Sequence, residues 1–419
     1  MTPGAGTLII GASQAGLQLA VSLRDCGDRG PITLVGEEPH APYQRPPLSK
    51  AFLHGTTELE HLWLRTMEYL NDIGVTLVTG ERIDTVALDA GGPAGTAGTQ
   101  RGRVLPFDRL ALTVGARPRR LAVPGAQLDG VTYLRTADDA AALRQWQNDA
   151  ESVVVIGGGF IGLEAAAVAR AQGKSVTVIE AADRLIGRAV APVVSEFYRA
   201  AHTRRGVDVR LGCQVVSLGG SANRVRTVAL SDGTQIPADI VIVGIGVEPC
   251  IELARQLDLE SAGGIVVDRY ARTSNPSVVA AGDCTVQPNP LGGIDRVRLE
   301  SVQNAVSQAK TAAATLTGRA QPNDAVPWFW SDQYDLKLQI AGLAGGYDRF
   351  VVRGDTDGEA FSVLYYRAGT LLAVDAVNAP ADYMAVRKAL NQGGTVPAEA
   401  AADTAVALRR LIVPQAIGA

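Results

Sequence analysis

The chain has 419 residues, of which 47% are hydrophobic and 20% are charged, and its formal net charge is −4. This length is enough for about three domains of roughly 150 residues, whose cores can form without disulfide bonds. So weak a net charge excludes a general attraction to nucleic acid or to anionic lipid, and a charged partner would have to bind a local patch.

The N-terminus and the apolar segments give no sign of targeting or membrane insertion. The opening residues lack the basic stretch, apolar core and cleavage site of a signal peptide. No apolar run approaches the ~20 residues that a membrane-spanning helix needs. We therefore expect a cytoplasmic protein without a membrane span.

The cysteines are too dispersed to form a disulfide framework or a zinc site. Cys26, Cys213, Cys250 and Cys284 make no C-x-x-C or C-x4-C pair. We expect no metal site, and we interpret Cys284 as a small buried hydrophobic residue.

A short apolar run at residues 7–10 opens the first of two similar units. Gly11 follows it at once, and a helical pattern begins near Gly16. A second apolar run, at residues 32–35, leads into Glu37. This order of strand, glycine turn, helix, strand and acid is typical of a dinucleotide-binding fold.

The same organisation recurs from residue 152. Residues 153–156 predict a strand, Gly157 to Gly162 form the turn, and an alanine-rich helix follows. The next strand, residues 176–179, ends on Glu180. The first glycine and the acid are 26 residues apart in the first copy (37 minus 11) and 23 in the second (180 minus 157).

Each residue of this pattern has a physical task. The first glycine permits the tight turn, the second lets the backbone approach the pyrophosphate, and the third lets the helix pack closely on the strand. The terminal carboxylate accepts hydrogen bonds from the ribose hydroxyls. The second copy is complete, whereas the first has Ser13 in place of the middle glycine. Two dinucleotides in one chain suggest a nicotinamide that stacks on a flavin, but sequence order leaves open which unit holds which.

A longer set of motifs makes a family resemblance specific. These motifs are Pro42-Tyr-Gln-Arg45-Pro-Pro-Leu-Ser-Lys50, Thr113-Val-Gly115-Ala-Arg-Pro118, Tyr133-Leu-Arg135-Thr, Gly244-Ile-Gly246-Val-Glu-Pro249, Ala281-Gly282-Asp283-Cys284, Arg298-Leu-Glu-Ser-Val302-Gln-Asn304-Ala and Trp328-Phe-Trp330-Ser-Asp-Gln333. With them, the chain resembles over essentially its whole length the FAD-dependent, putidaredoxin reductase-like NADH:ferredoxin reductases of bacterial oxygenase systems. These enzymes have the pyridine nucleotide-disulfide oxidoreductase fold without its redox disulfide.

The resemblance implies an α/β fold with two Rossmann-like, glutathione reductase-like domains and a C-terminal α+β domain. The FAD-binding domain would be discontinuous, at residues 1–112 and 246–320. The NAD-binding domain would span residues 113–245 and the C-terminal domain residues 321–419. The first glycine unit would then hold FAD and the second NADH.

The resemblance also assigns cofactor-binding residues. Glu37 would bind the FAD ribose, Asp283 would bind the ribityl chain, and the helix from Val302 would stabilise the anion of the reduced flavin through its N-terminus. The other FAD positions are Gly11, Ala15, Gly16, Lys50, Ile83 and Arg135. The NAD positions are Gly157, Gly159, Ile161, Gly162, Glu180, Arg188 and Gly246.

Lys50 and Glu164 match the family's catalytic positions beside the flavin N5. An ion pair there would orient the ring and bias N5 electrostatically. Without the resemblance, the preferred interpretation of Glu164 is a carboxylate in the first turn of a helix, stabilised by the helix dipole. With the resemblance, we prefer the functional role.

Glu180 predicts NADH as the electron donor. A carboxylate at this position would repel the 2′-phosphate of NADPH, and Ala181 and Ala182 follow it where cations would be needed. Arg188 matches a family residue that reaches the adenine side, so some NADPH use stays open.

The electrons need an external acceptor because the stretch after Glu37 carries no cysteine. The resemblance implies an acidic 2Fe–2S ferredoxin that docks near the flavin mouth and feeds a monooxygenase or dioxygenase. Residues 328–330 would form an aromatic edge there or part of a core. Candidate cations for docking are Arg65, Arg296, Arg298, Lys310, Arg409 and Arg410. A rubredoxin reductase, an NADH oxidase and a redox-sensing flavoprotein remain alternatives.

Overall fold

The computed structural model describes residues 4–292 and 295–414, so the first three residues of the stretch inspected for a signal peptide lie outside it. The chain divides into two compact units. The first unit comprises Met1–Gln44, Leu59–Arg117 and Glu248–Pro327, and the second comprises Arg45–Glu58, Pro118–Val247 and Trp328–Ala419. Within the described residues, no helix is long and apolar enough to cross a membrane.

A five-stranded parallel sheet forms the centre of the first unit. Its order is β19-β7-β1-β2-β3, and every neighbouring pair is parallel. The strands are β1 (Thr7–Ile10), β2 (Ile32–Val35), β3 (Val75–Val78), β7 (Arg109–Leu112) and β19 (Val278–Ala280). Their aliphatic side chains are almost all buried, as expected for a parallel sheet covered on both faces.

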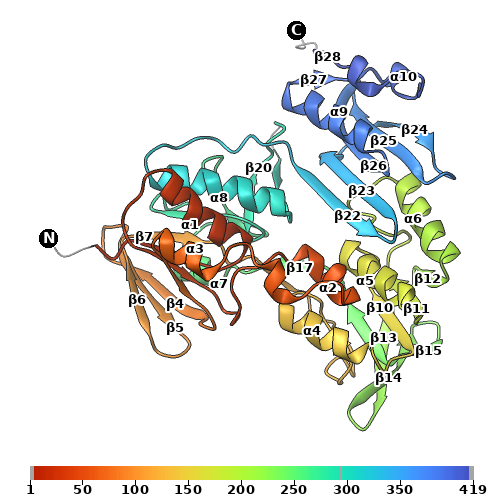
Figure 1. The fold of residues 1–419 in the computed structure, drawn as a ribbon, viewed down its shortest axis with the longest axis horizontal. Helices are drawn as coiled ribbons and strands as arrows, with labels where there is room; N and C mark the ends of the chain where they lie inside the picture. The colour runs from red at the N-terminus through yellow and green to blue at the C-terminus, as the bar shows by residue number, and fades with distance from the viewer. Residues whose placement is uncertain (1–3, 293–294, 415–419) are drawn as a thin grey trace. The chain divides into compact units, whose positions relative to one another are not determined.

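Helices cover one face of this sheet. A smaller antiparallel sheet shares a second hydrophobic core with it. Figure 1 shows α1 (Gln14–Asp25) and α8 (Val302–Leu316) side by side. Their apolar residues share a core with Ile9, Leu34 and Val279. The smaller sheet consists of β4 (Ile83–Leu88), β5 (Gly95–Thr99) and β6 (Val104–Phe107). The unit also contains η2 (Leu59–Leu62), α3 (Met67–Asp72), α7 (Glu252–Gln256), β18 (Ile265–Val266), β20 (Thr285–Pro288) and β21 (Arg296–Val297).

A second parallel sheet begins the second unit. Its order is β12-β11-β10-β16-β9. The strands are β9 (Val131–Thr132), β10 (Ser152–Ile156), β11 (Ser175–Glu180), β12 (Val207–Leu211) and β16 (Ile240–Val243). The helices are α4 (Ala137–Trp146), α5 (Phe160–Ala171) and α6 (Pro192–Arg204), and an antiparallel sheet joins β13 (Val215–Ser221), β14 (Arg224–Leu230) and β15 (Gln235–Pro237). Residues 45–58 add η1 (Pro46–Ser49) and α2 (Ala51–His54).

An antiparallel sheet with one long helix completes the second unit. Its order is β22-β23-β26-β25-β24. The strands are β22 (Trp328–Gln333), β23 (Leu336–Gly342), β24 (Arg349–Asp355), β25 (Ala360–Arg367) and β26 (Thr370–Val377), and α9 (Pro380–Asn391) packs on them. Shorter elements follow at β27 (Gly394–Thr395), α10 (Ala398–Ala401), η3 (Leu408–Arg410) and β28 (Val413–Pro414). This sheet shares one hydrophobic core with α5 and α6.

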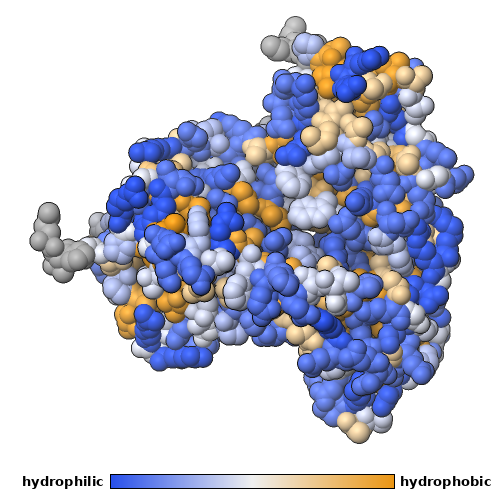
Figure 2. All heavy atoms as spheres, in the orientation of Figure 1, coloured by the Kyte–Doolittle hydropathy of each residue, from blue (hydrophilic) through white to orange (hydrophobic). Residues whose placement is uncertain are grey.

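The architecture confirms the predicted fold class of two Rossmann-like sheets and a C-terminal α+β part. The predicted domain boundaries stay a prediction. Residues 45–58 cluster with the second unit, in which Ser49 and Lys50 bond Glu164. On the face shown in Figure 2, most residues are hydrophilic. Large apolar side chains that are exposed include Val104 at 64% exposure and Met384 at 57%.

Candidate functional site

The first glycine turn leads from β1 into α1 and packs closely against neighbouring backbone. Gly11 has a φ of +113°, and a Cβ there would lie 2.2 Å from the Thr113 carbonyl oxygen. A Cβ on Gly16 would lie 2.0 Å from the Gly11 carbonyl oxygen. Neither position has room for a side chain, so the turn requires glycine at both.

Ser13 and Gly159 occupy equivalent places as the N-caps of α1 and α5. A Cβ on Gly159 would meet no atom of the described chain within 4 Å. Packing therefore does not explain this glycine, whereas close approach of a ligand to the backbone does. The same openness explains why the first turn accommodates a serine. The N–H groups in the first turns of both helices suit a pyrophosphate.

A small-residue cradle lies beside the start of α1. A Cβ on Gly282 would lie 3.2 Å from the Ala15 Cβ and 4.0 Å from the Ala305 Cβ. Ala281 joins Ala15 and Ala305 in a small buried cluster. The structure thus brings the loop of Asp283 and the first turns of α1 and α8 together, which fits a site for the FAD that the fold implies.

A buried amide network under this cradle was missed in the sequence. Gln308 accepts hydrogen bonds from the Gly282 N–H (2.8 Å) and the Thr285 hydroxyl (2.9 Å). Its Nε2 donates to Gln287 Oε1 at 2.8 Å, and Asn304 donates to Gln308 Oε1 at 3.2 Å. The network fastens the Asp283 loop to α8. The available signal was a set of amides within otherwise apolar segments.

Glu37 and Ile83 lie on neighbouring segments of the first unit. The Glu81 N–H donates to the Gly36 carbonyl at 3.0 Å. Asp84, and to a smaller extent Glu37, raise the pKa of Arg82. Glu37 is exposed after β2, whereas Ile83 is buried, at 7% exposure.

The second glycine turn repeats the first in the second unit. Gly157 has a φ of +108°, and a Cβ there would lie 2.4 Å from the Gly244 carbonyl oxygen. A Cβ on Gly162 would lie 2.3 Å from the Gly157 carbonyl oxygen. Ile161, in the first turn of α5 directly before Gly162, is 44% exposed.

Alanine substitutions at Gly162 and Gly159 are expected to have different effects. Gly162→Ala forces a backbone shift and is expected to lower the free energy of unfolding by about 2 kcal/mol. Gly159→Ala is expected to leave stability within about 0.5 kcal/mol but to weaken NAD⁺ binding about tenfold. Thermal denaturation and titration of the oxidised enzyme with NAD⁺ check this. Equal effects of both variants on both measurements would contradict the assignment.

Glu180 is held by the backbone at the end of β11. Its Oε2 accepts from the Gly158 N–H at 2.7 Å, and its Oε1 accepts from the Ala182 N–H at 2.8 Å. A carboxylate has about four acceptor positions, so two remain for ribose hydroxyls. The geometry fits the predicted contact with the NAD ribose.

The two arginines after β11 have different environments. Arg184 donates to the Val190 carbonyl (2.7 Å), to the Ser195 hydroxyl (3.2 Å) and to the Gly187 carbonyl, so it braces its own loop. Arg188 is exposed, and its guanidinium would lie 3.4 Å from a Cβ on Gly246. The structure thus brings Arg188 and Gly246 together and leaves Arg188 accessible to a ligand.

Lys50 and Glu164 form an ion pair within the second unit. Lys50 Nζ lies 2.6 Å from Glu164 Oε2, with the side chains 19% and 2% exposed. Glu164 Oε2 also accepts from the Ser49 hydroxyl at 2.5 Å, and Oε1 accepts from the Ser331 hydroxyl at 2.6 Å. Both serines were missed as site residues. A polar residue after the aromatic run 328–330 was the available signal for Ser331.

The position of Glu164 excludes the alternative that it is a carboxylate in the first turn of a helix. The first turn of α5 holds no acidic residue, and Glu164 lies one turn further on, facing the core. Burial raises the pKa of Glu164, while Lys50 and the hydroxyls of Ser331 and Ser49 oppose that rise. The groups that favour the charged form of Glu164 are therefore these partners and not the helix dipole.

The predicted FAD positions are divided between the two units. Lys50 and Arg135 belong to the second unit, and the other predicted positions to the first. The Arg135 N–H donates to Asp139 at 3.1 Å, and its carbonyl accepts from Arg45 at 2.7 Å. Cys284 is fully buried, and burial raises its pKa to about 12, as expected for an inert thiol.

The aromatic run of β22 is packed on both sides of its sheet. The Phe329 ring lies 4.7 Å from that of Phe160 at the start of α5. Trp328 and Trp330 lie 5.6 Å apart, and the Arg387 guanidinium lies 4.9 Å from the Trp328 ring. All three aromatic residues are half-buried.

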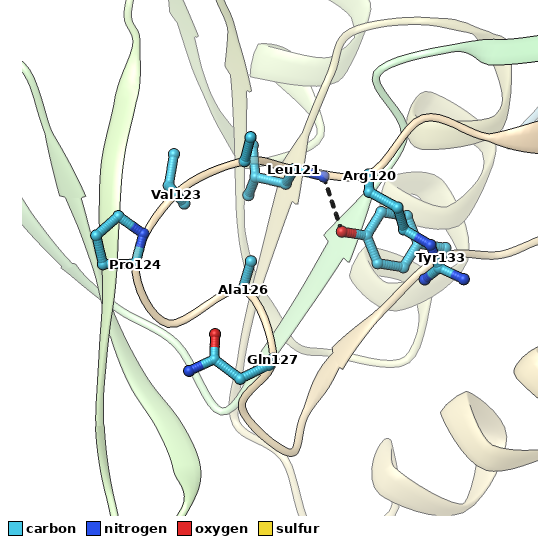
Figure 3. A pocket seen from close by; sticks show the side chains of 8 residues that line it. Arg120, Leu121, Val123, Pro124, Ala126, Gln127 and Tyr133 are labelled. Atoms are coloured by element: carbon cyan, nitrogen blue, oxygen red, sulfur yellow. Dashed lines mark hydrogen bonds between the residues drawn. The ribbon is translucent and has the colours of Figure 1, made fainter.

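A shallow hollow of about 520 Å³ lies in the second unit, away from the glycine turn. Figure 3 shows its lining side chains from residues 120–127 with Tyr133 at one side. The Tyr133 hydroxyl accepts from the Leu121 N–H at 2.9 Å, and the Arg120 guanidinium lies 4.4 Å from the Tyr133 ring. None of the predicted site residues lines the hollow.

Comparisons with known proteins identify the family. Residues 6–309 match the family model described as pyridine nucleotide-disulphide oxidoreductase, and residues 328–412 match the one described as reductase C-terminal. Rhodocoxin reductase of Rhodococcus erythropolis is 48% identical over 397 residues, which cover 95% of this chain and 92% of that protein.

Two solved structures are similar over almost the whole chain. The ferredoxin reductase for the CYP199A2 system of Rhodopseudomonas palustris has a TM-score of 0.93 and 42% identity, covering 98% of this chain and 100% of that one. The covalent putidaredoxin reductase–putidaredoxin complex has a TM-score of 0.92 and 38% identity, covering 97% of each chain. The predicted resemblance to ferredoxin reductases is confirmed. The chain belongs to the pyridine nucleotide-disulphide oxidoreductase family and is an oxidoreductase whose cofactors are FAD and NAD(H).

Proposed function

We propose that this chain is an NADH-dependent ferredoxin reductase, which moves hydride from NADH to FAD and passes single electrons to a 2Fe–2S ferredoxin. The observation that carries the proposal is the pairing of two dinucleotide-type glycine turns with four free cysteines that form no redox disulfide. An enzyme so built has no internal acceptor for the electrons. The likeness to ferredoxin reductases supports a ferredoxin as the external one.

The residues of the chain supply binding, orientation and charge. Flavin supplies the ability to accept two electrons as hydride and to release them one at a time. The turns at Gly11 and Gly157 would hold the two pyrophosphates, and Glu37 and Glu180 would hold the riboses. Lys50 and Glu164 provide a fixed, water-poor ion pair for the hydride-transfer step. They act by electrostatic preorganisation and not by releasing a proton.

The ferredoxin would be steered by exposed cations on each unit. Lys310 is exposed on α8 of the first unit, and Arg409 and Arg410 are exposed on η3 of the second. Arg296 and Arg298 are already paired with Glu260 and Glu300, so they offer less free charge. An acidic partner would bind these cations with an affinity that falls as salt rises. A cytoplasmic location and supply of a monooxygenase or dioxygenase remain parts of this proposal.

Reduction of cytochrome c by NADH, with and without a 2Fe–2S ferredoxin from the same organism, tests the function. Strong stimulation by the ferredoxin is expected, with NADPH far weaker than NADH. Stimulation by a rubredoxin instead would move the function to rubredoxin reduction. Rapid oxygen consumption without a carrier would indicate an NADH oxidase, and slow turnover with every carrier a redox sensor.

Ala181→Arg is expected to raise the kcat/KM for NADPH about tenfold because it adds a cation for the 2′-phosphate next to Glu180. Ala181 is exposed, so the substitution disturbs no core. The kcat/KM for NADH is expected to stay within about twofold. Ala181→Gln, which adds length without charge, is the control. If both variants leave the NADPH rate unchanged, position 181 lies away from the 2′-phosphate.

A further inference from the structure

A chain of buried side chains leads from Glu164 into the C-terminal sheet. Ser331 donates to Glu164 Oε1 at 2.6 Å, and Gln333 Nε2 donates to the Ser331 Oγ at 3.2 Å. His202 Nε2 lies 2.9 Å from Gln333 Oε1. The side chains of Ser331, Gln333 and His202 are all fully buried. Figure 1 shows the elements that carry them: β22 packs against α5, and the His202–Gln333 bond links β22 to α6.

The charge of Glu164 determines the direction of every bond in this chain. A carboxylate only accepts, so the Ser331 hydroxyl must donate to it and can only accept from Gln333. Gln333 then presents its amide nitrogen to Ser331 and its oxygen to His202, whose Nε2 must carry the proton. Burial lowers the pKa of His202, which favours the neutral ring, and in the tautomer with the proton on Nε2 the Nδ1 is an acceptor. The Tyr334 hydroxyl lies 3.4 Å from that Nδ1.

We propose that Ser331, Gln333 and His202 are positioning residues, a one-way series of donors that holds Glu164 as an oriented carboxylate for hydride transfer. The proposal rests on the role of Lys50 and Glu164 in the proposed function. Aligned donors polarise one another, so each strengthens the bond nearer the carboxylate. Ser331 and Gln333 both come from β22. The C-terminal part of the chain would therefore supply the hydrogen bonds that orient the Glu164 carboxylate, which belongs to the NAD-binding part.

Several charged and titratable groups among the described residues act on this hydrogen-bonded series. Lys50 pairs with Glu164 from the segment before α2, and Tyr198 of α6 interacts electrostatically with Glu164, Asp332 and Asp375. Arg205 acts on His202 from the end of α6, and its guanidinium lies 5.1 Å from the Tyr334 ring. The substitutions below change none of these groups, so a change in the titration of Glu164 would come from the donor chain.

The test uses the holoenzyme with the variants Ser331→Ala and Gln333→Leu. Two measurements are made on each: the rate of flavin reduction by NADH in anaerobic stopped flow, and the pH titration of the Glu164 carboxyl by infrared difference spectroscopy. Glu164→Gln identifies the infrared band. Ser331→Ala is expected to slow flavin reduction about tenfold and to move the carboxyl titration to higher pH. Gln333→Leu is expected to act in the same direction but only about two- to threefold.

Matched variants separate this role from simple packing. Ser362 is also fully buried in the C-terminal sheet and donates to a carboxylate, Asp382, at 3.0 Å. Ser362→Ala is expected to leave both measurements at wild-type values, and Ser331→Thr, which keeps the hydroxyl, is expected largely to restore them.

The proposal is overturned if Ser331→Ala titrates and reacts like Ser362→Ala, or if Gln333→Leu leaves the carboxyl titration unchanged. If Ser331→Ala does not fold, Gln333→Leu decides. If NADH reduces the flavin of Glu164→Gln at the wild-type rate, the Lys50–Glu164 pair has no role in hydride transfer, and the proposed role of the donor series fails with it. If NADH reduces the flavin normally but no ferredoxin is reduced, the result contradicts the proposed function and not the positioning role of Ser331, Gln333 and His202.

Discussion

Replacing Lys50 with methionine is expected to lower the free energy of unfolding by about 3 kcal/mol at pH 8 and to slow flavin reduction by NADH about 100-fold. The substitution leaves Glu164, at 2% exposure, with two hydroxyl donors and no cation. A buried carboxylate without its cation is costly, and the site loses a fixed charge. Chemical denaturation and anaerobic stopped flow measure the two effects.

The pH dependence of this effect has a defined sign. The pKa of Glu164 is already raised in the folded protein, and losing Lys50 raises it further. The stability difference between Lys50→Met and the wild type should therefore be small near pH 5 and grow as pH rises. The double variant Lys50→Met/Glu164→Gln should regain much of the stability at pH 8 but remain slow. A loss that is equal at both pH values would contradict an unpaired carboxylate.

Replacing Asp375 with asparagine is expected to make the protein more stable than wild type at pH 8. The free energy of unfolding of the variant minus that of the wild type should be roughly 4 kcal/mol larger at pH 8 than at pH 4. Asp375 is fully buried, and burial raises its pKa from 3.8 to about 7. Tyr365 donates to Oδ2, and Oδ1 has no hydrogen-bond partner among the described residues. The folded protein thus holds the proton that the unfolded chain releases.

The consequence is a loss of wild-type stability between about pH 4 and pH 7, which the variant should lack because its amide does not titrate. Asp357, exposed on the turn between β24 and β25, provides the control. Asp357→Asn should reproduce the wild-type pH profile of unfolding. A wild-type profile that is flat from pH 5 to pH 8 would show that Asp375 does not titrate in this range.

The parts of the fold that depend on local pattern were predictable. Residues 7–10 and 32–35 read as strands from the sequence and are β1 and β2, because buried parallel strands are short, continuous apolar runs. The turns at Gly11 and Gly157 were predictable for a related reason, since their positive φ and close contacts require glycine. Local chemistry is enough to fix such elements.

Contacts between distant segments were not predictable in the same way. Ser331 bonds Glu164 across 167 positions of the chain, and Gln308 bonds Gly282 across 26. A buried serine or glutamine looks in sequence like a surface residue, since only the tertiary fold brings its partner. The Lys50–Glu164 pair became a candidate through the family resemblance, and no spacing rule connects residues 114 positions apart.

The central claim is that the flavin's electrons leave to a ferredoxin. Enzyme reduced anaerobically with one equivalent of NADH, mixed in stopped flow with oxidised 2Fe–2S ferredoxin, tests it most directly. The account predicts that two ferredoxins are reduced for each flavin reoxidised, at a rate that falls as salt rises. Reduced flavin that persists with ferredoxin and reoxidises only when oxygen is admitted would contradict it.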